Sequence, residues 1–139
     1  MKKIYVLAGA VLLAACSSQE SPTLIGGSRD NHGCLGSAGY TWSQTRQTCL
    51  RLWEEGITLI PTNPTGAALA AFAVESNDYA RMEIFLPNPK KIFVLQQTGE
   101  DHDRWTSPVS DWTLHHSPAG WELKEKGVLR YKSKPAPTH

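Results

Sequence analysis

Apolar and polar residues alternate along several segments in the second half of the chain. The clearest segment runs from Arg81 to Leu86, where Met82, Ile84 and Leu86 share one face. A period of two is that of a half-buried β-strand. The other segments interpreted as strands are 57–60, 67–74, 91–97 and 128–132, and turn residues such as 87–89 separate them. The pattern therefore predicts an antiparallel β-meander.

A tryptophan-containing hairpin is expected near the C-terminus. If residues 117–120 form its loop, Leu114 lies opposite Leu123 and His116 opposite Trp121 on one face. The same register places His115 opposite Glu122 on the other face, as a cross-strand charge pair. In the strand that follows, Leu129 and Tyr131 are expected to point inward.

One helix is predicted before the strands, over residues 42–55. Thr41 and Gln44 have the spacing of a capping box, and Gly56 provides a stop. Inside the segment, the apolar residues Trp42, Cys49, Leu50 and Trp53 fall at helical spacing. The expected fold class is therefore α+β: an N-terminal, disulfide-stapled helix packed on an antiparallel meander of five or six strands, which would be able to curl toward a barrel.

The first residues have the pattern of a bacterial lipoprotein signal peptide. Two lysines are followed by an apolar run and by Leu13-Ala14-Ala15-Cys16. The run is shorter than the roughly 20 residues of a membrane-spanning helix, although an uncleaved helix and an ordinary secretory signal stay open as alternatives. The resemblance implies cleavage before Cys16, acylation of its thiol and, because Ser17 follows, anchoring in the outer membrane. Both orientations, periplasmic and surface-exposed, stay open.

Four parts of the chain follow from this pattern. We expect a signal peptide over 1–15, an acylated flexible tether over 16–29, one globular domain over 30–132 and a disordered tail over 133–139. Loss of Lys2 and Lys3 with the leader lowers the formal net charge from +1 to about −1. The remaining basic residues form no stripe, so a nucleic-acid partner is not expected.

With Cys16 acylated, Cys34 and Cys49 remain as an even pair in an oxidising compartment and are expected to form a disulfide. The alternative is a nucleophilic Cys34 with His32 as its base. A metal site at Cys34, Cys49 and His32 is a weaker alternative, because these residues lack the usual paired ligand spacings. A structural disulfide is the favoured interpretation.

Other catalytic and metal signals are weak. His115 and His116 are adjacent in a predicted strand and so point to opposite faces, while His102 lies in a polar loop beside Asp101 and Asp103. Residues 36–39 lack the Gly-x-Ser-x-Gly spacing of a nucleophile elbow. We therefore expect no catalytic residues, no metal site and no cofactor.

Two resemblances concern the cysteine-containing region. Residues 30–43 and 49–54, with Gly-Cys, Ser-Ala-Gly-Tyr-x-Trp and then Cys-x-Arg-x-Trp-Glu, resemble a family of short bacterial envelope lipoproteins. That resemblance implies a domain type and no particular activity. Residues 36–40 are also similar to the Ser-Gly-rich loop ending in tyrosine by which lipoproteins that inhibit lysozyme enter the lysozyme cleft. Those inhibitors are small, disulfide-tied antiparallel barrels.

The loop from Gly33 to Tyr40 is the leading candidate for a binding surface. Its glycines permit positive φ or a close backbone approach, and the bridge at Cys34 would hold it rigid. Alternatively, the glycines only let the loop pack under the helix. The candidate ligand-binding residues are Ser37, Tyr40 and Trp105.

These observations predict a non-enzymatic binding or inhibitor module that is anchored through Cys16. Its expected partners are the membrane, through the lipid, and a protein ligand from the envelope or the host. The alternative is a structural or assembly accessory of another envelope complex. A broad apolar patch on an uncovered sheet face would favour this alternative.

Overall fold

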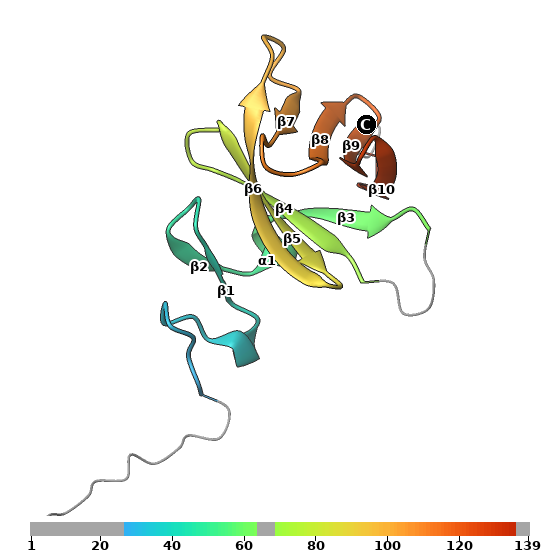
Figure 1. Cartoon of the computed structure of the whole chain (residues 1–139). Coiled ribbons are helices and arrows are strands. Elements are labelled where there is room, and N and C mark those ends of the chain that lie inside the picture. Colours follow the sequence, from blue (N-terminus) through green and yellow to red (C-terminus); the bar gives the residue numbers. More distant parts are fainter. Residues whose placement is uncertain (1–26, 64–68, 136–139) are drawn as a thin grey trace, which may run out of the picture.

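The computed structural model describes residues 27–63 and 69–135, which form an N-terminal unit beside a β-barrel (Figure 1). The predicted leader, the predicted acylation site Cys16 and most of the predicted tether lie outside the described residues, as does the end of the predicted tail. Within the described part of the chain, no helix has the length and apolar character needed to cross a membrane.

Eight antiparallel strands close into a barrel in the order β10-β3-β4-β5-β6-β7-β8-β9. Neighbours in sequence are neighbours in space, and the contact between β10 and β3 closes the sheet, so the architecture is an up-and-down barrel. The strands are β3 (Ile57–Pro61), β4 (Ala71–Glu75), β5 (Arg81–Pro87), β6 (Lys90–Thr98), β7 (Arg104–Thr106), β8 (Trp112–Ser117), β9 (Gly120–Glu125) and β10 (Val128–Lys132).

Alternate side chains of the strands fill the barrel. Met82, Ile84 and Leu86 of β5 all lie in the core, as their period of two predicts. Eight strands enclose a space that side chains can fill, and here the other buried members of this core are Leu59, Ala71, Ala73, Leu95, Trp105, Trp112, Leu114 and Leu123.

The predicted C-terminal hairpin is confirmed in register. Strands β8 and β9 pair Leu114 with Leu123 and His116 with Trp121, and Ser117 and Gly120 close the turn. His115 lies opposite Glu122, also as predicted. Its ion pair, however, is with Asp103, whose carboxylate lies 3.3 Å from His115 Nε2.

The predicted fold class is wrong, because the protein is mostly β and the helix over 42–55 does not form. The segment instead contains a hairpin of β1 (Thr41–Ser43) and β2 (Thr48–Leu50), followed by the short helix α1 (Leu52–Glu55). Trp42 and Cys49, which share a helical stripe in the prediction, are direct cross-strand partners. Pairing between strands and docking against the barrel override the local capping signal here.

The N-terminal unit, residues 27–55, packs on the outer face of β4 and β5. Phe85 points away from the barrel interior yet is only 6% exposed, because it packs with Leu50 and Val74 in a second, smaller core. Strand β5 is therefore buried on both faces, and this explains why its burial pattern is continuous and not alternating.

Glu83 fixes the hairpin turn to the barrel. This outward-facing carboxylate is 1% exposed. It accepts hydrogen bonds from the hydroxyls of Ser43 (2.6 Å) and Thr45 (3.1 Å) and from the backbone N–H groups of Gln44 (3.1 Å) and Thr45 (3.3 Å). A buried carboxylate needs such donors, since its desolvation is otherwise unfavourable.

Candidate functional site

The weakest seam of the barrel lies between β3 and β10. Only two residue pairs join these strands, Tyr131 with Pro61 and Lys132 with Ile60, and one further backbone bond runs from the N–H of Thr62 to the carbonyl of Arg130. The chain beyond Lys132 then leaves β3. The seam consequently opens toward the start of β3.

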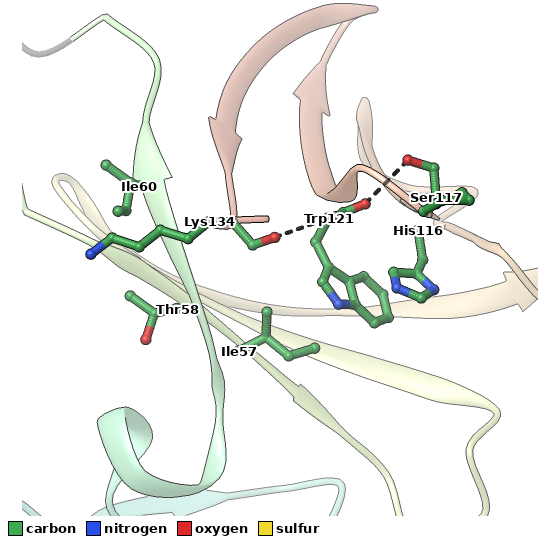
Figure 2. A pocket seen from close by; sticks show the side chains of 10 residues that line it. Ile57, Thr58, Ile60, His116, Ser117, Trp121 and Lys134 are labelled. Atoms are coloured by element: carbon green, nitrogen blue, oxygen red, sulfur yellow. Dashed lines mark hydrogen bonds between the residues drawn. The ribbon is translucent and has the colours of Figure 1, made fainter. Parts of the chain in front are cut away.

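At this opening, Ser133 continues the pairing with β9. Its N–H donates to the carbonyl of Trp121 at 2.9 Å, and its Oγ accepts from the N–H of Trp121, also at 2.9 Å (Figure 2). Gly120 permits the close approach: its φ is +119°, and a Cβ placed there would lie 2.7 Å from Ser133 Oγ. The tail thus continues the pairing of β10 with β9 and separates from β3.

A hollow of about 720 Å³ occupies the opening, which we call the seam hollow. Its volume lies within the range of small-molecule sites, which often occur at the mouths of barrels. The lining residues are Ile57, Thr58, Ile60, His116, Ser117, Pro118, Gly120, Trp121, Ser133 and Lys134.

The aromatic side of the seam hollow is prearranged. The His116 and Trp121 rings stack with centroids 4.2 Å apart, and Trp121 also packs against Trp105 at 5.3 Å. Figure 2 shows this pair on one side of Ile57, with the Lys134 side chain extending toward Ile60 and Thr58 on the other. The site therefore has an aromatic end and a polar, basic end.

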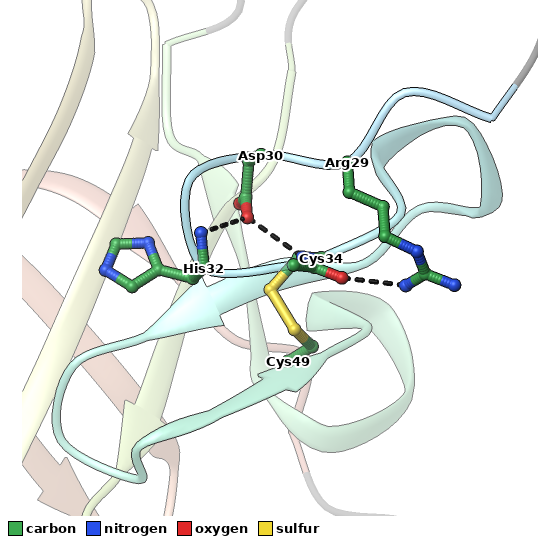
Figure 3. Close-up of a disulfide and its surroundings, with 6 residues drawn as sticks. Arg29, Asp30, His32, Cys34 and Cys49 are labelled. Carbon is green, nitrogen blue, oxygen red and sulfur yellow. Dashed lines mark hydrogen bonds between the residues drawn. A yellow bond between two sulfur atoms is a disulfide. The ribbon is translucent and has the colours of Figure 1, made fainter. Parts of the chain in front are cut away.

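The predicted disulfide between Cys34 and Cys49 is confirmed, with the two Cα atoms 5.5 Å apart (Figure 3). The carboxylate of Asp30 accepts hydrogen bonds from the N–H groups of His32 and Cys34, both at 2.9 Å. The N–H of Cys34 is the largest cause that holds the pKa of Asp30 below its ordinary value of 3.8. The bridge joins the N-terminal loop to β2, and not to a helix as we had expected.

The predicted binding residues do not form one surface. Tyr40 is 37% exposed, and the Arg51 guanidinium lies over the Tyr40 ring, 4.7 Å from the ring centroid. Ser37 is exposed in the 3-10 turn η1 (Gly36–Ala38). Trp105 is 3% exposed in the barrel core. The expectation that Trp105 presents a contact surface is wrong, since its side chain points inward from β7 and packs against Trp121.

Trp53, which sequence reasoning assigned to a buried helical stripe, is 56% exposed. A Cβ added to Gly39 would lie 1.9 Å from its ring, so Gly39, at φ +83°, provides the space against which this ring packs. Tyr40, Arg51 and Trp53 therefore belong to one rigid part of the N-terminal unit.

The histidines and acids considered as metal ligands do not gather. His102 Nδ1 lies 2.9 Å from the side-chain oxygen of Gln97, and His115 pairs with Asp103. Over residues 27–63 and 69–135, no three side chains of His, Cys, Asp or Glu are placed to hold one metal ion.

The seam hollow itself was not identified from the sequence. Lys134 and Ser133 belonged to the predicted tail, and Thr58 was an ordinary strand residue. The only sequence signal was the hairpin register that paired His116 with Trp121. Comparison of the chain with protein-family models, with curated proteins and with solved structures finds no match.

Proposed function

We propose that the protein is a non-enzymatic binding module, carried at the outer membrane by lipid on Cys16, and that its ligand occupies the seam hollow. The observation that supports this is the hollow itself. The short pairing between β3 and β10 leaves a preformed space beside aromatic and basic side chains. Preformed sites lose little conformational entropy on binding.

The chemistry of the lining supports binding over catalysis. Its one imidazole, His116, stacks on Trp121. The ten lining residues include no carboxylate or thiol to pair with His116. The lining serine hydroxyls are bonded elsewhere: Ser117 Oγ donates to the carbonyl of Gly120, and Ser133 Oγ accepts from the N–H of Trp121. Apolar groups with a few polar ones are typical of sites that hold a ligand without transforming it.

Native mass spectrometry of the lipidated protein, extracted from bacterial envelopes, tests this proposal. We expect a co-purifying small molecule at one copy per chain. Thr58→Trp should remove it, because Thr58 is exposed and lines the hollow, so a large ring can fill the space without disturbing the core. Thr98→Trp, at an exposed position of β6 outside the hollow, is the matched control. Equal ligand occupancy in both variants would contradict the proposal.

A protein-inhibitor role is the second candidate, and the exposed Tyr40 and Trp53 with the partly exposed Arg51 support it. Tyrosine, arginine and tryptophan are the residue types that dominate binding energy in protein interfaces. The barrel is also the architecture that the resemblance to lysozyme inhibitors implies, although likeness of fold does not determine function.

A lysozyme assay tests this role. Inhibition should be lost in Tyr40→Ala and kept in Tyr79→Ala, because Tyr79 is an exposed tyrosine on the β4–β5 turn, outside the N-terminal unit. Absence of inhibition by the unmodified protein would remove lysozyme as the target.

An accessory role in an envelope assembly is the third candidate. An apolar groove of about 190 Å³ runs along the outside of the barrel where Leu52, Phe72, Phe85 and Ile92 meet. This groove is smaller than the seam hollow, so the ligand-binding role is the better supported one.

A further inference from the structure

The register of β3 places its backbone donors beside the seam hollow. Backbone groups of alternate residues in an antiparallel strand point to the same neighbour. Because the N–H of Thr62 points to β10, those of Ile60 and Thr58 point to the same side. Continued pairing would place Lys134 opposite Thr58. The pairing between β3 and β10 ends at Lys132, and no strand of the described chain pairs with this side of Thr58.

The charges around the hollow have one sign. Lys134 contributes an ammonium group and Thr58 a hydroxyl and a backbone N–H, whereas no Asp or Glu lines the site. Hydrogen-bond donors and a cation, with no carboxylate nearby, favour the binding of a negatively charged ligand group. This polar end lies next to Ile60, and the hollow continues past Ile57 to Trp121 (Figure 2).

We infer that the seam hollow binds a single-chain anionic amphiphile, with its acidic head at Lys134 and Thr58 and its apolar chain along Ile57 and Trp121. The inference rests on the proposed binding function and specifies the ligand class. A stacked sugar fits the site less well, because the His116 ring already occupies one face of Trp121.

Calorimetric titration with laurate and with dodecyltrimethylammonium, which carry chains of equal length and opposite head charge, tests the inference. The processed chain, residues 16–139 carrying Cys16→Ser, is titrated with its disulfide formed and below the micelle concentration of each probe. We expect laurate to bind more tightly than the cation, and Lys134→Glu to weaken laurate about fivefold, the effect of one exposed charge contact. Lys126→Glu makes the same charge change at an exposed position outside both the hollow and the outer groove, and should leave laurate binding unchanged.

A third probe, lysophosphatidylglycerol, distinguishes a free acid from a lipid as the source of the anionic head. The inference is supported if either anionic probe binds more tightly than dodecyltrimethylammonium. The result that overturns it is equal binding of laurate and the cation together with no effect of Lys134→Glu. The binding function would survive that result if Thr58→Trp still removed the ligand found in envelope extracts. Loss of the Thr58→Trp effect would instead overturn both.

Discussion

The two regions of this protein are held together in different ways. The barrel has an interior of apolar side chains. Among them, Leu59, Ile84, Leu95 and Leu114 are completely buried. The N-terminal unit places only Leu50 and the partly buried Leu52 in the second core. It relies instead on a disulfide and on the polar contact with Glu83.

This difference shows how a small segment without a core of its own can still be rigid. A short two-stranded hairpin is marginally stable in water. Here one covalent bond holds the hairpin to the preceding loop, and Phe85 and Glu83 of β5 hold it to the barrel. The barrel therefore supplies the stability, and the N-terminal unit depends on the barrel for its position.

The largest expected effect is that of a cavity in the barrel. Leu114→Ala should lower the free energy of unfolding by about 4 kcal/mol, because the fully buried side chain leaves a void that its neighbours fill only in part. Urea denaturation followed by tryptophan fluorescence measures it. Val109→Ala, at a position that is 92% exposed, is the control and should change stability by less than about 0.5 kcal/mol. Equal effects would show that the barrel core does not carry the stability.

The next effect concerns the disulfide. Replacing both Cys34 and Cys49 by serine should lower the free energy of unfolding of the N-terminal unit by about 3 kcal/mol, since the bond closes a loop with a sequence separation of 15 residues. Hydrogen exchange should show faster exchange at the amides of β1 and β2, with the barrel amides unchanged. Equal loss of protection in β5 and β8 would mean that the two regions unfold as one unit.

A smaller effect is expected from the contact at Glu83. Glu83→Gln keeps the size of the side chain but replaces an acceptor oxygen by a donor, and two hydroxyls and two backbone N–H groups lose part of their partner. We expect a loss of about 2 kcal/mol, observed in urea unfolding, and faster exchange at Gln44 and Thr45. Glu100→Gln, at an exposed loop position, is the control. Unchanged exchange at Gln44 would show that the second core and the hydrogen bond from Arg46 to the carbonyl of Glu75 hold the unit without Glu83.

The sequence predicted what depends on local periodicity. The period of two identified β5, and the turn at 117–120 set the register of β8 and β9 correctly. Counting the cysteines predicted the bridge. The three residues of β7 are too few to give a periodic signal, and the strand was missed.

The remainder depends on contacts between distant residues. Thr41 and Gln44 have a good helix signal, but Glu83, some 40 residues away, binds Ser43 and stabilises a hairpin turn instead. The seam hollow likewise lies where Ser133 binds Trp121 while the chain separates from Thr58. Neither pair has a local sequence pattern, so the candidate site could not be located from the sequence.

The smallest effect is a dependence on pH within the N-terminal unit. The pKa of Asp30 is held below its ordinary value of 3.8, chiefly by the hydrogen bond from the N–H of Cys34 and also by that from His32. A lowered pKa in the folded state means that the carboxylate stabilises the turn above pH 3.8, and that this contribution is lost as the pH falls through the lowered pKa. We therefore expect the exchange protection of the Cys34 amide, relative to the barrel amides, to fall as the solution is acidified below pH 3.8. Asp30→Asn, whose amide oxygen can still accept a hydrogen bond but does not titrate in this range, should make that ratio independent of pH. A ratio in the unmodified protein that stays constant to the lowest pH would show that the Asp30 carboxylate does not order the loop, which would leave that role to the disulfide and to the backbone hydrogen bonds between Asp30, Gly33 and Cys34.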